Sequence, residues 1–313
     1  MHTVPSSGRN YGAQARRLRR VLRTVQPAVV HSHGYLADAL LFLASIGLGI
    51  PRVSTVHGFT GGGSRNRLYE WVQVRILARF DAIIAVAQTA GVGLVKSGVP
   101  PSRVRVIPNR WVSPPQALSR VDARRRLGLP QDGFVVGWVG RLSQEKGPDL
   151  FLRALARTRT TSIQAAIIGG GGEKEALNRL AGELDVGSRV RWCGVHLPAA
   201  ELLRAFDVLM LTSRTEGTPM ILLESVSIEV PIIATAVGGI PAMFDPGDVA
   251  LVPFGKTVVE DLARALDEVA IDPSEALRRA ATAASRPSGE KCSEWGRDYQ
   301  AVYEALLSSG KTM

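Results

Sequence analysis

The feature that most constrains the fold is an apolar–polar–apolar pattern across residues 207–235. Residues 207–212 (DVLMLT) are a short apolar run without helical caps, which predicts a buried β-strand. Past Gly217 the sequence favours a helix, because Thr218 can act as an N-cap and Pro219 suits the first helical position. Residues 230–235 (VPIIAT) predict a second strand. The segment is therefore a predicted β-α-β unit.

Two carboxylates, Glu216 and Glu224, stand at the carboxyl end of the first predicted strand and in the first turns of the helix. Ligands of open α/β sheets bind at this edge, where a helix N-terminus offers free N–H groups and partial positive charge to a phosphate. Carboxylates would repel a phosphate, so we interpret them as acceptors for hydroxyl groups beside it. Glu224 could hold a ribose, and Glu216 the group that the phosphate carries. The alternative is a solvated Glu216 and a Glu224 on a helix surface.

Length and composition limit the number of domains and the cellular setting of the chain. A chain of 313 residues predicts about two domains, and 45% hydrophobic residues suffice for two cores. The two cysteines, Cys193 and Cys292, give neither a disulfide framework nor a metal-binding spacing, which favours a reducing, cytoplasmic setting. The N-terminus lacks the apolar core of a signal peptide. The longest apolar stretch, residues 39–50, is shorter than a membrane span of about 20 residues and predicts a buried helix.

Charge is distributed unevenly along the chain. Residues 1–115 hold fifteen Arg or Lys against three acidic residues, whereas the whole chain has a net charge of +10. A basic half attracts phosphates, anionic lipid or nucleic acid. The helical cluster at residues 16–23 (RRLRRVLR) could lie on an anionic membrane surface, making the protein peripheral to it, or could be a solvated face. Because no RNA-binding signature is present, we expect no specific nucleic acid.

The N-terminal half repeats a strand-then-turn form. Residues 29–35 and 51–58 both read as strands that run into a glycine, placing His33 and His57 at strand ends. Residues 81–87 and 103–109 predict two more strands, the last ending at Asn109, and residues 66–80 predict a helix. Strands that alternate with helices indicate a parallel sheet. Three nearby histidines could suggest zinc, but the sequence offers no supporting ligands, and we expect no metal.

The C-terminal half begins with a strand at residues 134–139 that runs into Gly140. A glycine there lets a phosphate approach the backbone, while Arg141 and Lys146 supply two cations for a pyrophosphate. Residues 164–168 and 190–195 predict further strands, and the end of the latter, at Val195, could give main-chain contacts to a base. An Arg–Lys pair on a loop is by itself commonly just solvated.

Taken together, these motifs resemble the retaining glycosyltransferases of family 4. The resemblance is carried by the two Glu eight residues apart, by EGTP, VPIIAT and VGGIP around them, and by VHSHGY, STVHG, DAIIAVA and VIPN in the N-terminal half. It implies the GT-B fold: two Rossmann-like domains with parallel sheets facing across a cleft. It also implies transfer of a sugar from a nucleotide diphosphate sugar to a hydroxyl of a saccharide or lipid-linked acceptor, without a metal or other cofactor.

The resemblance assigns roles by position. The catalytic residues would be His57, Arg141, Lys146 and Glu216; donor binding would involve Gly140, Val195, Gly217, Thr218, Pro219 and Glu224; and His33 and Asn109 would lie on the acceptor side. The expected domains are 1–115 and 116–285, with a helix at 286–313 that crosses back to the first domain.

One departure from the family pattern concerns the start of the chain: by this resemblance we expect about the first third of the first domain to be missing, which would leave a sheet edge unpaired. Two other functions remain open: a nucleotide-sugar epimerase, and a non-catalytic protein that binds a nucleotide sugar.

Overall fold

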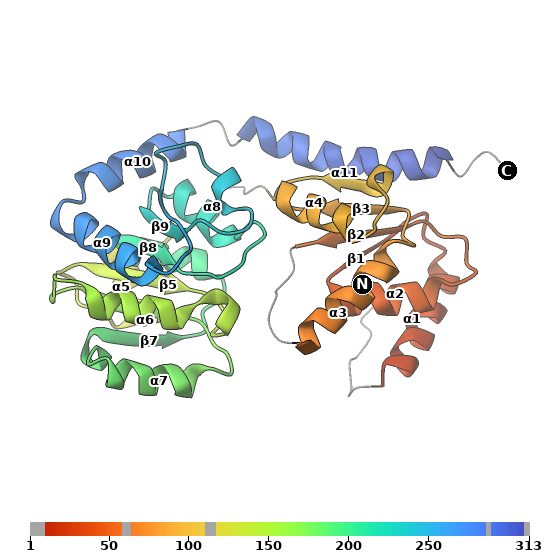
Figure 1. Ribbon diagram of the computed structural model, residues 1–313. Coiled ribbons are helices and arrows are strands. Elements are labelled where there is room, and N and C mark those ends of the chain that lie inside the picture. The colour runs from red at the N-terminus through yellow and green to blue at the C-terminus, as the bar shows by residue number, and fades with distance from the viewer. Residues whose placement is uncertain (1–9, 58–63, 110–116, 286–288, 310–313) are drawn as a thin grey trace. The chain divides into compact units, whose positions relative to one another are not determined.

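The structure is a computed structural model that describes residues 10–57, 64–109, 117–285 and 289–309 (Figure 1). Internal contacts divide the chain into two compact units. Unit 1 comprises residues 1–109 and 293–313, and unit 2 comprises residues 110–292. The division falls a few residues from the boundaries expected at 115 and 285. Each unit is described by itself.

Unit 1 is built on a four-stranded parallel sheet in the order β1-β2-β3-β4. Each crossover between consecutive strands contains a helix, so the polypeptide follows the β-α-β pattern that the sequence predicts. Strand β1 forms one edge of the sheet and β4 the other, within the part of the chain that the structure describes. The strands are Val30–His33, Arg52–Val56, Ala82–Ala85 and Val104–Val106; the helices are α1 (Tyr11–Val25), α2 (Tyr35–Ser45), α3 (Ser64–Leu77), α4 (Gln88–Lys96) and the 3-10 turn Pro101–Arg103.

Alternate residues of the strands of unit 1 face two different layers. Val56 and Ile83 pack with residues of α2, α3 and α4, whereas Val53 and Ile84 pack against the last helix, α11 (Gly289–Ser309). Figure 1 shows α11 along one face of the sheet and α2 and α3 along the other. The aromatic residues at helical spacing near the end of the chain are therefore partly buried and pack against the core of unit 1: Trp295, Tyr299 and Tyr303.

Unit 2 is built on a six-stranded parallel sheet in the order β10-β9-β8-β5-β6-β7. This is the Rossmann order, in which the chain fills one half of the sheet, returns to the centre and fills the other half. The reversal lies between β5 and β8, which pair directly. The strands are β5 (Val135–Val139), β6 (Gln164–Ile168), β7 (Val190–Gly194), β8 (Val208–Leu211), β9 (Ile232–Thr235) and β10 (Ala250–Val252).

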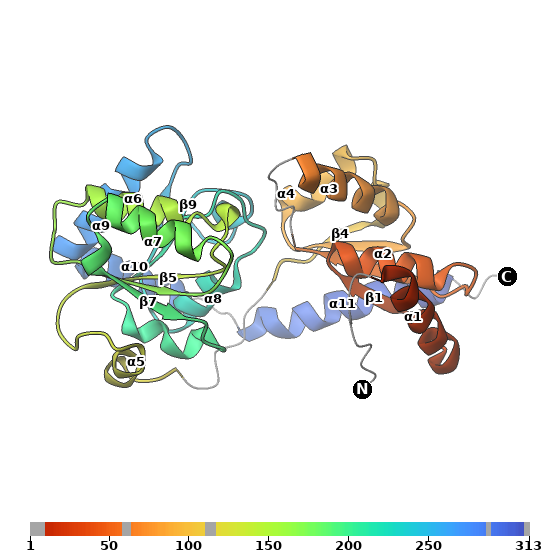
Figure 2. The same cartoon turned by 90° about the horizontal axis from the view of Figure 1, so that it is seen from below.

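Helices cover both faces of this sheet (Figure 2). One core joins the strands to α6 (Pro148–Arg157), α7 (Lys174–Glu183) and α9 (Val258–Ile271). The other core joins them to α5 (Arg120–Leu127), the 3-10 helix Ala199–Ala205 and α8 (Met220–Ser227). Helix α10 (Ser274–Ser285) packs on α8 and α9. Trp138 is fully buried at the centre of the first core.

The apolar stretch at residues 39–50 contains a helix, but α2 begins four residues earlier, at Tyr35. Helix α2 ends at Ser45, and the two glycines that follow, Gly47 and Gly49, both adopt positive φ (+70° and +66°). No helix among the described residues is both long and apolar enough to cross a membrane.

Candidate functional site

The residues of unit 2 that were predicted to bind a pyrophosphate and a sugar lie at the point where the strand order of its sheet reverses. Arg141 and Lys146 follow strand β5, and Glu216 follows strand β8, the direct neighbour of β5. Parallel strands present their carboxyl ends at one edge, and a crevice opens there because the connections leave in opposite directions. The topology therefore places these loops together at the usual ligand position of a Rossmann-like sheet.

Lys146 and Glu216 form a bidentate ion pair. Lys146 Nζ donates to Glu216 Oε1 at 2.7 Å and to Oε2 at 2.8 Å, and Ser213 Oγ donates to Oε1 at 2.6 Å. The Glu216 side chain is 6% exposed and that of Lys146 26%. Sequence reasoning assigned these residues to different parts of a ligand, and it missed both their mutual contact and Ser213.

A network of hydrogen bonds joins the loops that carry the pair. Thr212 Oγ1 donates to the Gly147 carbonyl at 2.7 Å and accepts from Trp138 Nε1 at 3.2 Å. Arg214 makes a bidentate contact with Asp149, both distances being 2.7 Å. These contacts join the loop after β5 to the loop after β8, so the backbone that carries Lys146 and Glu216 is held in place by hydrogen bonds. Arg214 and Asp149 carry no motif that would have marked them.

Two glycines are required for this close approach of loops. Gly147 has φ +64°, and a Cβ there would lie 2.0 Å from the carbonyl oxygen of Thr212. Gly238 has φ +57°, and a Cβ there would lie 1.8 Å from the carbonyl oxygen of Glu216. Side chains are excluded at both positions by conformation and by space. The backbone of Glu216 is thereby fixed from the β9 side as well.

Arg141 differs from Lys146 in its surroundings. Its side chain is 67% exposed, and its Nη1 lies 3.5 Å from Glu145 Oε1, beyond a short hydrogen bond. An exposed pair of this kind contributes little to stability. Arg141 is therefore the more accessible cation of the two, whereas the charge of Lys146 is already balanced by Glu216.

The helix after Glu216 begins later than predicted. Helix α8 starts at Met220, and Pro219 occupies the N-cap position with extended backbone (φ −69°, ψ 114°), so Thr218 is not the N-cap. A residue that precedes proline is disfavoured in helical conformation, which explains the shift. No side chain caps α8, and the Gly217–Pro219 segment leads directly into its first turn. The positive end of the helix dipole therefore lies at Pro219 and Met220, which follow Glu216 by three and four residues.

Glu224 is the fifth residue of α8 and is half-buried. Burial raises the pKa of its carboxyl group above the ordinary value, because the charged form loses water. Gly140 lies directly after β5, where its N–H donates to Ile168 O. Val195 follows β7, two strands away from β5, and is 66% exposed. At about 4.8 Å per strand, that end of the sheet lies roughly 10 Å from Gly140.

In unit 1 the structure brings two of the three predicted residues together. His33 ends β1 and His57 follows the neighbouring β2; His33 Nδ1 and His57 Nε2 share a hydrogen bond of 3.1 Å. Asn109 lies beyond β4, two strands from β2, so it belongs to the far end of the same edge. The predicted acceptor residues are therefore separated across the sheet.

A third histidine, His31, lies under this pair. Its ring stacks on that of His33 with centroids 4.6 Å apart, its Nδ1 lies 2.7 Å from Tyr303 Oη and its Nε2 lies 2.8 Å from Thr55 Oγ1. Burial lowers the pKa of His31 to about 4, helped by the neighbouring His33 and His57. Burial and His33 also lower the pKa of His57, against a raising effect of Asp38. His31 and His57 are thus biased toward the neutral form.

Asp38 is a buried carboxylate that no sequence motif marked. It is fully buried and accepts hydrogen bonds from Ser32 Oγ (2.6 Å), Ser54 Oγ (2.7 Å) and Gln73 Nε2 (2.8 Å). These partners lie on β1, β2 and α3, and Asp38 itself on α2. The cluster therefore joins four elements of unit 1. No group of His, Cys, Asp and Glu among the described residues has a metal-binding arrangement.

Comparison with known families identifies the class of protein. Residues 119–286 match the family described as "Glycosyl transferases group 1", and residues 2–109 match "Glycosyltransferase Family 4". The chain belongs to the group 1 glycosyltransferases, and the resemblance to family 4 is confirmed.

Individual relatives and structures are consistent with this family. The chain is 30% identical over 282 residues to the D-inositol 3-phosphate glycosyltransferase of Stackebrandtia nassauensis, covering 82% of this chain and 63% of that protein. It is 28% identical to the enzyme of the same name from Rhodococcus opacus, covering 88% and 66%. The chain thus spans about two thirds of the length of these relatives.

Solved structures confirm the predicted fold class, α/β with two Rossmann-like domains of the GT-B type. The crystal structure of HepE from Anabaena in complex with UDP and glucose aligns with a TM-score of 0.77 at 21% identity, covering 98% of this chain and 84% of that one. Sucrose-phosphate synthase from Thermosynechococcus elongatus aligns with a TM-score of 0.76 at 20% identity, covering 98% and 78%.

Proposed function

We propose that this protein transfers a sugar from a nucleoside diphosphate sugar to a hydroxyl group, with retention of configuration at the anomeric carbon. The observation that carries the proposal is the Lys146–Glu216 pair at the switch point of the sheet, beside Arg141 and the uncapped start of α8. Such a site offers two cations and helix N–H groups to a diphosphate, with carboxylates next to them for hydroxyls. The family and the relatives support the same activity.

In the proposed reaction, the bond between the anomeric carbon and the phosphate oxygen breaks as the acceptor oxygen bonds to the same carbon. The acceptor's proton passes to the leaving phosphate. Negative charge grows on the diphosphate, and Arg141, Lys146 and the N-terminus of α8 stabilise it. Removing one such group typically costs about 10²–10³ in rate. Because these cations come from the protein, we propose that no metal is required.

The ion pair of the free protein suggests how the donor engages. When a phosphate takes Lys146 as a partner, Glu216 loses its cation and becomes free to accept hydrogen bonds from sugar hydroxyls. Glu224, half-buried on α8, would hold the ribose. We further propose that His57 contacts the donor sugar, and that His33 and Asn109 contact the acceptor.

Binding and turnover can be tested separately. Thermal unfolding with UDP-, GDP- and ADP-sugars identifies the donor, because a ligand at 100 times its Kd stabilises the folded state by about 2.7 kcal/mol. Release of the nucleoside diphosphate is then measured with and without a hydroxyl acceptor, and with EDTA. We expect acceptor-dependent release that EDTA leaves unchanged and that Lys146→Ala lowers by about 10²–10³-fold.

The control is Arg153→Gln, which removes an exposed arginine of α6 in the same unit. It should leave release unchanged, whereas Arg141→Gln should lower it. Donor binding without release would favour a non-catalytic binding protein, and release that ignores the acceptor would favour an epimerase or a hydrolase. Absence of any nucleotide-sugar binding would refute the proposal.

We also propose that unit 1 associates with an anionic membrane surface through α1. Four arginines of this helix are exposed: Arg16, Arg17, Arg20 and Arg23. A fifth, Arg19, donates to the carbonyls of Ala44 and Ile46, and Leu43 and Ile46 beside it are each 52% exposed. Basic groups next to exposed apolar side chains suit the interface of an anionic bilayer.

Co-sedimentation with vesicles tests this surface. We expect binding to vesicles that contain phosphatidylserine but not to vesicles of phosphatidylcholine alone, and weaker binding at higher salt. Arg17→Gln with Arg20→Gln should lower it by roughly thirtyfold, at about 1 kcal/mol for each of the two basic residues. Equal binding to both kinds of vesicle would contradict the electrostatic argument.

A further inference from the structure

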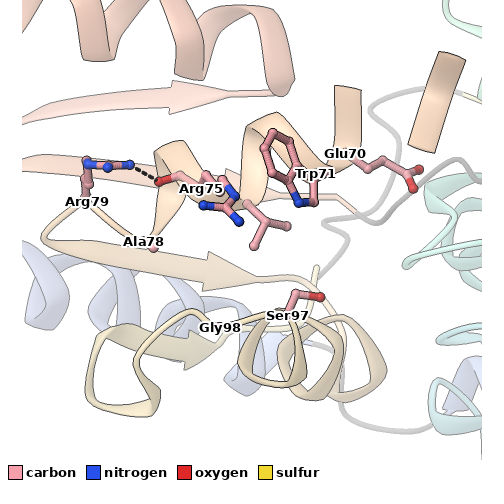
Figure 3. Close-up of a pocket in the computed structure, with 8 residues that line it drawn as sticks. Glu70, Trp71, Arg75, Ala78, Arg79, Ser97 and Gly98 are labelled. Carbon is pink, nitrogen blue, oxygen red and sulfur yellow. Dashed lines mark hydrogen bonds between the residues drawn. The ribbon is translucent and has the colours of Figure 1, made fainter. Parts of the chain in front are cut away.

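Unit 1 contains a cavity of about 780 Å³ that lies outside the site described above. It is lined by residues of α3 and by the turn that ends α4 (Figure 3): Glu70, Trp71, Val74, Arg75, Ala78, Arg79, Ser97 and Gly98. Its volume falls in the range of small-molecule sites, about 300–1,000 Å³. The cavity is therefore large enough for a ligand of one or two rings.

The cavity lies at the opposite edge of the sheet from His33 and His57. Those histidines follow the carboxyl ends of β1 and β2. Helix α3 runs back from that edge and ends at Leu77, shortly before β3 begins, and α4 likewise ends at Lys96, before β4. The residues that line the cavity lie from the middle of α3 onward and in the turns that follow α3 and α4, toward the amino ends of the strands. A ligand here would not occupy the position proposed for the acceptor.

Two arginines give the cavity a positive character. The guanidinium of Arg75 stacks over the Trp71 ring, 4.2 Å from its centroid, and Arg79 Nη1 donates to the Arg75 carbonyl at 2.8 Å. Neither guanidinium forms an ion pair with any carboxylate in the described part of the chain. Figure 3 shows the Glu70 side chain directed away from both. Two arginines on one cavity wall match the planar, multidentate recognition of a phosphate.

The apolar side chains of the cavity wall indicate which group could bind next to the phosphate. Trp71 is 54% exposed and lines the cavity together with Val74, which is buried. An exposed aromatic face next to a guanidinium suits the C–H face of a sugar ring. Ser97, which donates to the Gly93 carbonyl, adds a polar oxygen at the rim that can accept a hydrogen bond from a hydroxyl.

We propose that this cavity binds a phosphorylated saccharide, with the phosphate on Arg75 and Arg79 and the sugar ring against Trp71. The site is separate from the glycosyl-transfer site, and its existence does not depend on the activity proposed above. It would let the chain hold an anionic sugar at a second position on unit 1.

The test is direct binding, measured by calorimetry with glucose 6-phosphate, glucose, AMP and inorganic phosphate. We expect one glucose 6-phosphate per chain, no detectable binding of glucose, and at least tenfold weaker binding of AMP and of inorganic phosphate. Arg75→Gln and Trp71→Ala should each weaken glucose 6-phosphate binding by about tenfold or more. Both side chains are exposed, so unfolding midpoints should stay close to that of the parent protein.

Two control variants locate the bound ligand. Arg105→Gln removes an exposed arginine of β4 outside the cavity and should leave binding unchanged. Lys146→Ala should also leave it unchanged; a loss of binding in that variant would place the ligand in unit 2 and overturn the proposal. Binding that survives both Arg75→Gln and Trp71→Ala would overturn it as well. AMP or inorganic phosphate binding as tightly as glucose 6-phosphate would refute the saccharide assignment.

Discussion

The Lys146–Glu216 pair allows a quantitative prediction about the stability of unit 2. At 2.7 Å and an effective dielectric constant of about 20, the gross attraction is about 6 kcal/mol. Desolvation of both groups opposes it, because the Glu216 side chain is only 6% exposed and that of Lys146 26%. The pair lies between an exposed bridge, worth up to about 1 kcal/mol, and a buried one whose disruption costs about 3–5 kcal/mol. We expect a net coupling of about 2 kcal/mol.

A double-mutant cycle measures this coupling. Lys146→Met should cost about 2–3 kcal/mol, since it leaves a buried carboxylate with Ser213 as its remaining partner, and Glu216→Gln about 1–2 kcal/mol. The double variant should cost less than the sum by the coupling energy. Urea unfolding followed by tryptophan fluorescence gives the free energies, with Trp138 reporting on the adjoining loop.

The matched control is the pair of Arg264 and Asp261 on α9, where the arginine side chain is 69% exposed and the aspartate 20%. Arg264→Met combined with Asp261→Asn should give a coupling of about 0.3–0.5 kcal/mol. If the coupling of Lys146 to Glu216 is no larger than this, solvent screens the pair. The proposal that a donor phosphate replaces Glu216 as the ion-pair partner of Lys146 would then be wrong.

Three further predictions concern the frame around both sites. The pKa of His31 is about 4 in the folded protein and about 6.5 in the unfolded chain, so between these values the unfolded chain binds more protons and stability falls as pH drops from 6.5 toward 4. The loss of stability at pH 5 relative to pH 7 should be about 1 kcal/mol after allowing for partial exposure. His31→Gln should remove that part of the pH dependence in urea titrations. Gly238→Ala should cost more than 3 kcal/mol because its Cβ would overlap a carbonyl oxygen, whereas Gly182→Ala, with open space in a helix, should be neutral or stabilising in the same assay. Arg124→Met should cost about 2–3 kcal/mol, because it removes a fully buried guanidinium that donates to the Ala205 carbonyl and to Asp207, which keeps Arg120 at 2.7 Å; a thermal unfolding midpoint shifted by less than 2 °C would contradict this.

Much of the fold follows from local pattern, and the sequence predicts it closely. Strand β6 spans residues 164–168 as predicted, since a short apolar run between turn signals leaves few alternatives. The start of α8 was wrong by one residue, because the N-cap preference of Thr218 competes with the restriction that the following proline imposes. Local propensities conflicted there, and the backbone restriction prevailed.

The contacts within the site were beyond sequence reasoning. Lys146 and Glu216 are 70 residues apart, and they meet only because β5 and β8 are neighbours, which depends on strand order. His33 and His57 meet for the same reason on β1 and β2. Pattern locates the strand ends that carry functional side chains, but pairing in the sheet decides which of them touch. Arg214 and Asp149, which brace the site, carry no signal in a single sequence.

The position of α11 has a consequence for how the protein is made. The face of the unit 1 sheet that carries Val53 and Ile84 is covered by residues that follow Asn109 by more than 180 positions. At about 5–20 residues per second, a ribosome needs roughly 10–40 s to supply them. During that interval, while unit 2 is synthesised, one apolar face of the unit 1 sheet remains exposed to solvent. The unit synthesised first is therefore the one completed last, and chaperones would have their longest opportunity to bind it.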